Sequence, residues 1–252
     1  MARAFDATDD VLLNSGVAAL DTAKDWLMWG WMYQDDWGEA GLADMYSMYT
    51  GGGSNYAVEI SGRGDIAAGK AFDCWQIASG ANARYTTVAD SLVLNKWQFV
   101  GVWFDDSANK FNGVWIGDLN TVPTKDTSPQ NDSTLTGTRY AVAHATVGNL
   151  GTTGLRTVNG QLSDIGVYQP TSITAAQAEA YCIARWKGIT PPSTDLYGHW
   201  PLNSGIDSGT SNIELDYGPN GYDLSTTSDS TRPSPAVGPS LAHMRRFGGM
   251  PI

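Results

Sequence analysis

The fold of this chain is decided by two stretches of its sequence, Arg3-Ala-Phe-Asp-Ala-Thr-Asp-Asp-Val-Leu-Leu-Asn14 and Val158-Asn-Gly-Gln-Leu-Ser-Asp-Ile-Gly-Val-Tyr168. The first predicts a strand whose end carries the adjacent carboxylates of Asp9 and Asp10. The second passes a glycine turn and then alternates apolar with polar residues, which predicts a late strand. Both point to a chain built from β-strands.

The segments between these stretches also read as strands. Residues 26–37 carry aromatic side chains at both alternating sets of positions, which predicts a strand buried on both faces or one at a sheet edge. Residues 54–60 and 72–77 follow with period two, and residues 95–106 and 110–118 form a hairpin pattern. Residues 121–138 are polar and predict a long surface loop, after which residues 139–147 predict another strand.

One helix is expected, over residues 175–187. Thr174 and Gln177 have the spacing of a capping box, and the apolar residues Ala178, Cys182 and Trp186 recur at intervals of four. Gly188 and the prolines at 191 and 192 should end this helix.

The composition excludes several classes of function. The formal net charge is -11, from 26 acidic and 15 basic residues, so a nucleic acid partner would be repelled. The two cysteines are far apart and have no metal-site spacing, which favours buried thiols over a disulfide framework or zinc site. We find no secretion signal and no apolar run that predicts insertion into a membrane, so synthesis in the cytoplasm is expected.

Several of these patterns resemble the laminin-G-like, concanavalin A-like jelly rolls. In that family a first strand of the form F-D-G-x-D-D-x-V accompanies a late G-x-I-D-D-V-R-I-Y strand, and the hairpin of residues 95–118 resembles the family's central hairpin. The resemblance implies an all-β fold, an antiparallel jelly-roll β-sandwich with one short helix in the C-terminal half. It implies a sandwich of residues 1–190, lead-in-like strands at 191–230 that pack on it, and an extended arm at 231–252.

The order of these parts resembles accessory structural proteins of tailed bacteriophages. That resemblance implies a non-catalytic virion protein, either a capsid decoration protein or a subunit of the head or tail surface, made in the host cytoplasm. Its partners would be capsid or tail proteins and its own copies, as a homo-oligomer such as a trimer. Arg245, Arg246 and Phe247 would form the docking arm. The alternative is a carbohydrate-binding lectin that recognises host glycans, with or without calcium.

Calcium is the one metal ion that the sequence suggests, although none is required. Asp9 and Asp10, if brought near Asp164 of the late strand, would supply part of the oxygen shell that calcium needs. The simpler interpretation is that these aspartates cap turns or face solvent.

A glycan or a partner protein would need an exposed aromatic side chain. Trp37 is the candidate, because the polar Asp35 and Asp36 precede it and Gly38 follows it. Burial in the core or at an interface is the competing interpretation.

Catalysis is not expected. Glycosidases of this fold carry paired carboxylates on one strand, and none of the four glutamates here has such a companion. Glycoside hydrolysis is therefore the third hypothesis. The sequence also lacks a nucleophile elbow, and His144, His199 and His243 lack the spacing of a metal site.

Overall fold

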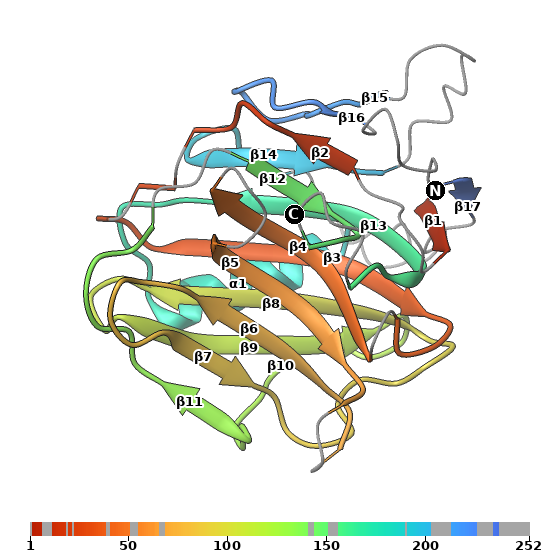
Figure 1. Cartoon of the computed structure of the whole chain (residues 1–252), viewed down its shortest axis with the longest axis horizontal. Helices are drawn as coiled ribbons and strands as arrows, with labels where there is room; N and C mark the ends of the chain where they lie inside the picture. The colour runs from red at the N-terminus through yellow and green to blue at the C-terminus, as the bar shows by residue number, and fades with distance from the viewer. Residues whose placement is uncertain are drawn as a thin grey trace, which may run out of the picture.

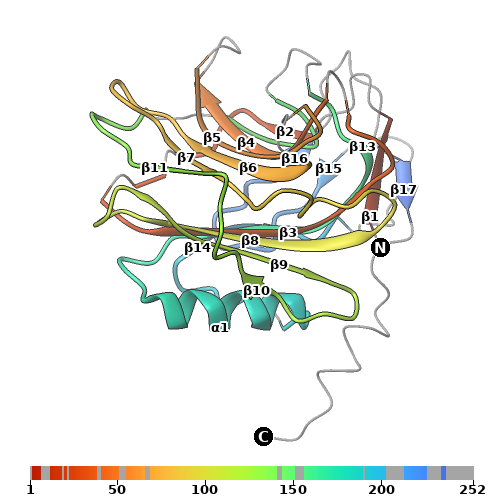
Figure 2. The same ribbon diagram turned by 90° about the horizontal axis from the view of Figure 1, so that it is seen from below.

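Two antiparallel sheets lie face to face in the structure, a computed structural model, and one helix packs outside them (Figures 1 and 2). The structure describes residues 2–6, 12–18, 20–21, 23–38, 41–50, 55–65, 69–140, 144–150, 156–189, 191–202, 213–225 and 234–236. This arrangement confirms the predicted all-β sandwich with a short helix.

The eight-stranded sheet has the order β10-β9-β8-β3-β13-β1-β17, and β14 also pairs with β13. Its strands are β1 (Ala2–Asp6), β3 (Trp26–Gln34), β8 (Trp97–Asp105), β9 (Lys110–Asp118), β10 (Thr124–Lys125), β13 (Asn159–Tyr168), β14 (Leu196–Trp200) and β17 (Ser234–Ala236).

The nine-stranded sheet has the order β11-β7-β6-β5-β4-β12-β2-β16-β15. Its strands are β2 (Leu12–Asn14), β4 (Leu42–Thr50), β5 (Asn55–Arg63), β6 (Ala71–Gln76), β7 (Ala83–Thr86), β11 (Asn131–Ser133), β12 (His144–Val147), β15 (Ile213–Glu214) and β16 (Leu224–Ser225).

The two stretches that predicted the fold differ in how well they match the structure. Residues 158–168 correspond to β13, which pairs with β1 on one side and β3 on the other. The first stretch is two strands rather than one, because β1 belongs to the eight-stranded sheet and β2 to the nine-stranded sheet. Asp9 and Asp10 fall between them, outside the described residues.

The middle of the chain also matches in part. The hairpin of residues 95–118 is confirmed as β8 and β9. The predicted loop at 121–138 instead contains β10 and β11, which extend one sheet each. The strand predicted at 139–147 is described as β12, from His144 to Val147, with an isolated bridge between Arg139 and Ala78 before it.

Aromatic residues fill both faces of β3, as its sequence predicted. Trp26, Met28 and Met32 point into the core between the sheets. Trp29 and Trp31 belong to a second cluster on the opposite face of the eight-stranded sheet. Both faces of β3 are buried in apolar clusters, which explains why apolar and polar residues hardly alternate in its sequence.

The helix α1 (Ala175–Trp186) covers that second cluster (Figure 2). The Thr174 and Gln177 capping box is present as predicted. Cys182 and Trp186 are fully buried against the sheet, and the Trp186 indole nitrogen donates to the Asp118 carbonyl at 2.7 Å. Within the described residues, no helix is long and apolar enough to cross a membrane.

The C-terminal segment adds strands to both sheets. β14 pairs with β13 and β16 pairs with β2. Trp200 at the end of β14 stacks on Tyr46 of the nine-stranded sheet, with ring centroids 5.9 Å apart. In the arm at 231–252, the structure describes residues 234–236, which form β17 beside β1; Arg245, Arg246 and Phe247 fall outside the described residues.

Candidate functional site

The predicted aromatic candidate lies in the turn that follows β3. The Trp37 ring is partly buried, packs on the core and has the Lys70 ammonium 5.0 Å from its centroid. Asp36 accepts a hydrogen bond from the Gly38 amide at 2.7 Å and one from the Asn159 side chain at 2.6 Å. The carboxylate of Asp36 and the ring of Trp37 thus already have partners within the chain, while Asp35 is exposed.

The calcium candidates are placed only in part. Asp164 lies on β13 with a positive φ of 53°, and one carboxylate oxygen is 2.6 Å from the His199 ring. Asp9 and Asp10 fall outside the described residues. No three His, Cys, Asp or Glu side chains of the described part are grouped as a metal site. Calcium binding stays a prediction.

The outward face of the nine-stranded sheet carries a network of hydrogen-bonded polar side chains. Its members lie in two rows across the strands, each row a series of directly paired residues. The first row is Asp44, Ser61, Asp73 and Thr86, and the second is Thr146, Ser47, Glu59, Trp75 and Arg84. We call these residues, with Arg63 and Arg156, the polar face.

Asp73 is the centre of this polar face. Its carboxylate is fully buried and accepts five hydrogen bonds, from Arg63 at 2.8 Å, Arg84 at 3.0 and 2.9 Å, Thr86 at 2.7 Å and Trp75 at 2.7 Å. Charge-assisted bonds of this kind hold guanidinium groups in fixed directions. The buried carboxylate therefore orients two arginines and an indole.

Glu59 has the same role for a third arginine. Its carboxylate accepts from Arg156 at 2.8 Å and from Ser61 at 3.2 Å. Burial raises the pKa of Glu59, and the nearby Arg156 opposes that rise. The Glu59 side chain is only 3 % exposed, and the Arg156 guanidinium paired with it is 26 % exposed.

Asp44 lies beside this pair with no hydrogen-bond partner for either carboxylate oxygen. Complete burial, reinforced by the charge of Glu59, raises its pKa well above the ordinary value of 3.8. The neutral acid is therefore favoured. The pKa values of Asp44 and Glu59 are both raised, and both carboxyl groups are almost completely buried.

Arginines and one indole form a partly exposed layer above the carboxylates. The side chains of Arg63, Arg84 and Arg156 are 20 %, 26 % and 26 % exposed. The Arg84 guanidinium stacks 4.5 Å from the centroid of the partly exposed Trp75 ring. This layer can donate hydrogen bonds to hydroxyl, carbonyl or acidic groups of a ligand.

An aromatic pair extends the polar face along β4 and β12. Tyr49 and His144 are paired across the strands and stack with ring centroids 4.9 Å apart. The Tyr49 hydroxyl and the His144 Nδ1 are buried and have no hydrogen-bond partner. The carboxyl oxygens of Asp44 likewise have no hydrogen-bond partner.

Sequence reasoning missed the polar face. Asp44, Glu59 and Asp73 are each a single charged residue between apolar neighbours on a separate strand. The available signal was this alternation, which places charged residues on one face of a strand. It could not show that the three strands are adjacent.

The comparisons with known proteins support the fold. No protein-family model matches the sequence, and no curated protein matches it. The enzymatically active domain of bacteriophage CBA120 tailspike protein 2 aligns with a TM-score of 0.57 and 12% identity, over 81% of this chain and 30% of that chain.

Two further solved structures are similar. Full-length tailspike protein 2 of an Escherichia coli O157:H7 bacteriophage aligns with a TM-score of 0.55 and 15% identity, over 81% of this chain and 27% of that chain. A heptameric SAP-like pentraxin from Limulus polyphemus aligns with a TM-score of 0.47 and 13% identity, over 69% of this chain and 76% of that chain. This chain thus spans less than a third of the tailspike chains, and the fold that it shares with them is a jelly-roll β-sandwich.

Proposed function

We propose that this chain is a non-catalytic carbohydrate-binding protein that binds glycans through the polar face. The observation that carries the proposal is the contrast between the two outward faces of the sandwich. The eight-stranded sheet has an apolar outward face under α1, whereas no described helix or strand covers the polar face (Figure 2). The arginines and Trp75 of the polar face are partly exposed and held in fixed directions, which suits them to a ligand.

The chemistry of the polar face suits a saccharide. An indole presents C–H-binding aromatic surface, and guanidinium groups held by carboxylates donate in fixed directions to hydroxyl oxygens. Trp75 and Arg84 combine both features in one stacked pair.

The proposal of a non-catalytic role follows from burial. Asp44 and Glu59 are the carboxyl groups closest to a glycosidase pair, and their relative exposures are 0% and 2%. A general acid must come within hydrogen-bond reach of the glycosidic oxygen. We therefore expect no glycoside hydrolysis; turnover that disappears in Asp44→Asn and Glu59→Gln variants would contradict this.

We propose further that the protein serves on the surface of a phage particle, as a capsid decoration protein or a head- or tail-surface subunit. The order of its sequence segments and the shared fold of a phage tailspike domain support this role. Glycan binding would then hold the particle near its host. Capsid or tail proteins and further copies of the chain would be its partners.

A glycan array tests the carbohydrate proposal. We expect wild-type protein to bind a subset of immobilised glycans and Arg84→Ala to lower that signal about ten-fold, the equivalent of about 1.4 kcal/mol. Lys187→Ala, a lysine at the end of α1 on the opposite side of the sandwich, is the matched control and should bind normally. Trp75→Phe is a second change on the polar face. Thermal melting of all three variants shows whether each one is still folded, which separates lost binding from lost folding.

The same array settles the alternatives. Equal signals for wild type and Arg84→Ala would place the glycan elsewhere, and the absence of any signal would reject the lectin. A chelator arm tests calcium, since binding that persists in chelator excludes a calcium requirement. Co-sedimentation of the purified protein with phage particles tests the virion role, and a monomer that fails to co-sediment would contradict it.

A further inference from the structure

The Arg84 side chain of β7 has one end of its guanidinium group available to a ligand. Its Nε donates to Asp73 Oδ1 at 3.0 Å and its Nη2 donates to Asp73 Oδ2 at 2.9 Å. The remaining nitrogen, Nη1, has no partner among the described residues and is not buried. A guanidinium group is planar and carries five N–H bonds. The end between Nη1 and Nη2 therefore still has N–H bonds that point away from Asp73.

The contacts around Arg84 fix the direction of this free end. The guanidinium stacks 4.5 Å from the centroid of the Trp75 ring, and the Trp75 indole nitrogen donates to Asp73 at 2.7 Å. The Asp73 side chain is itself fully buried and also accepts from Thr86 at 2.7 Å. An arginine held by a buried carboxylate and an aromatic ring loses little conformational entropy when it binds a ligand.

The other carboxylates of the outward surface are buried or already paired. Glu59 is buried and accepts from Arg156 at 2.8 Å. Asp65 is more exposed, but both of its oxygens accept from Arg63, at 2.9 and 2.7 Å. The available hydrogen-bonding groups beside Trp75 are therefore the N–H donors of Arg84.

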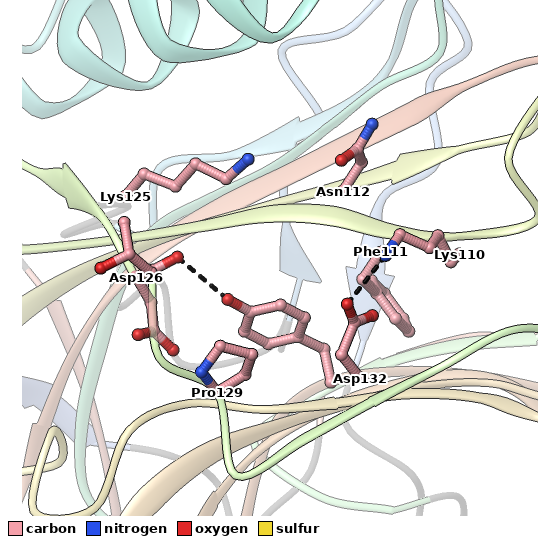
Figure 3. A pocket seen from close by; sticks show the side chains of 9 residues that line it. Lys110, Phe111, Asn112, Lys125, Asp126, Pro129 and Asp132 are labelled. Carbon is pink, nitrogen blue, oxygen red and sulfur yellow. Dashed lines mark hydrogen bonds and ion pairs between the residues drawn. The ribbon is translucent and has the colours of Figure 1, made fainter.

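Asp132 of the neighbouring strand β11 does not add negative charge to this surface. Ser133 pairs with Arg84 across the strands, whereas Asp132 pairs with Tyr85, whose side chain belongs to the core between the sheets. Strand alternation therefore turns the Asp132 side chain inward. Figure 3 shows it pointing toward Lys110 of the other sheet, which donates to it at 2.8 Å.

A carboxylate is the ligand group that matches the free end of Arg84. A guanidinium group only donates hydrogen bonds and a carboxylate only accepts them, through two oxygens that fit two parallel N–H bonds. A sugar hydroxyl also carries a proton, for which this end of Arg84 offers no acceptor. Bonds between an arginine and a carboxylate are also stronger than neutral ones, because both partners are charged.

The net charge of -11 does not exclude an acidic sugar. A nucleic acid carries a long row of charges that face a large part of the protein surface, whereas one acidic sugar carries a single charge. At physiological ionic strength the Debye length is about 8 Å, so carboxylates elsewhere on the molecule are screened. The contact with Arg84 therefore dominates.

We infer that the polar face selects glycans that carry a carboxylate, which the free end of Arg84 binds through two parallel hydrogen bonds. The inference rests on the proposed carbohydrate function and narrows its ligand to acidic sugars. The partly exposed Trp75 beside Arg84 offers apolar surface to the sugar ring. A neutral glycan would lack the charged partner for Arg84 and should bind more weakly.

Ligand-observed NMR tests the inference with the methyl glycosides of glucuronic acid, galacturonic acid and N-acetylneuraminic acid as probes. Each probe is compared with its own carboxyl methyl ester, which keeps the sugar ring but has no charge. We expect at least one acid to bind wild-type protein with a Kd of about 1–10 mM. Its ester should bind about ten-fold more weakly, because the charge-assisted pair with Arg84 is lost. This comparison changes the ligand only, so it does not depend on the folding of a variant.

Variants of Arg84 locate the carboxylate. In Arg84→Ala the ratio of acid to ester binding should fall from about ten to about one, whereas a purely structural role of Arg84 would weaken both ligands and leave the ratio unchanged. Arg84→Lys keeps the positive charge but loses the planar pair of donors, so the ratio should fall to an intermediate value. Lys187→Ala, at the end of α1, is the control and should keep the wild-type ratio. Thermal melting shows whether each variant is folded.

The outcomes separate this inference from the proposed function. If the glycan array shows neutral glycans that depend on Arg84 while acids and esters bind equally, the polar face is a sugar site without selectivity for carboxylates, and the inference fails alone. Stronger binding of sulfated than of carboxylated glycans, or an unchanged ratio in Arg84→Ala, would also overturn it. If neither the array nor any acid gives a signal, both ideas fail.

Discussion

Asp44 and Asp73 show how two aspartates on one face of a sheet acquire opposite properties. They lie in one cross-strand row with Ser61 between them, and both are fully buried. Asp73 accepts five hydrogen bonds, whereas Asp44 accepts none. Burial without partners favours the neutral acid, and so raises the pKa of Asp44.

This difference predicts how stability responds to pH. Above pH 3.8, the ordinary pKa of Asp44, the folded protein keeps a proton that the unfolded chain has released, so the free energy of unfolding falls as the pH rises. Asp44→Asn cannot titrate. Its stability relative to wild type should therefore increase from about pH 4 to about pH 7 in urea unfolding.

Asp65 provides a control of opposite sign. The Arg63 guanidinium lowers the pKa of Asp65, so this carboxylate adds stability that is present above its ordinary pKa and is lost as the pH falls. Asp65→Asn should lose stability relative to wild type as the pH rises. A pH-independent difference between Asp44→Asn and wild type would show that Asp44 is ionised in the folded protein.

At the scale of elements, α1 docks closely because the strand beneath it carries a glycine. A methyl group added at Gly101 of β8 would lie 2.4 Å from the Cys182 sulfur and 3.3 Å from its Cβ. The Trp186 indole anchors the C-terminal end of the helix to the Asp118 carbonyl. The helix α1 therefore covers the apolar outward face of the eight-stranded sheet.

Substitution of the glycine tests this contact. Gly101→Ala should lower the free energy of unfolding by about 1–3 kcal/mol, because overpacking displaces α1. In the double variant with Cys182→Ala the closest clash disappears, so its cost should be smaller than the sum of the two single changes. Urea unfolding of all four proteins completes the cycle, and strictly additive costs would mean that α1 does not pack as described.

At the scale of the whole molecule, the described residues of 191–202 and 213–225 contribute strands to both sheets. β14 extends the eight-stranded sheet and β16 extends the nine-stranded sheet. Trp200 is fully buried, stacks on Tyr46 and donates to the Tyr222 carbonyl at 2.7 Å. This segment therefore contributes to the common core.

Shared burial predicts a single cooperative unfolding transition. Trp200→Ala should lower the free energy of unfolding by about 3–5 kcal/mol, because a large cavity opens between the sheets. Tyr217→Ala, in the same segment but 63% exposed, should change it by less than about 0.5 kcal/mol. Far-ultraviolet circular dichroism and tryptophan fluorescence should give the same midpoint, and two separate midpoints would mean that the segment folds independently.

The parts of the fold that could be predicted depend on local patterns. The capping box at Thr174, the hairpin of β8 and β9, and the aromatic alternation of β3 each lie within one continuous stretch of the sequence. The sequence did not predict that β1 and β2 are separate strands in different sheets, because the apolar pattern of a segment does not show which sheet it joins. The candidate residues depended on local patterns in the same way. Trp37 was chosen for its polar neighbours and stays a prediction, whereas Asp44 and Arg84 drew no attention because their partners lie on other strands.

The sequence by itself determined that this chain is an acidic, strand-rich sandwich with one capped helix, because charge, propensity and periodicity are local properties. Only the tertiary structure decided which strands are neighbours. Pairing of β4, β5, β6 and β7 gathers Asp44, Glu59, Asp73 and Arg84, which are up to 40 residues apart, onto one face. Burial and hydrogen bonding then assign each charged group its role, and both depend on contacts that no single segment contains.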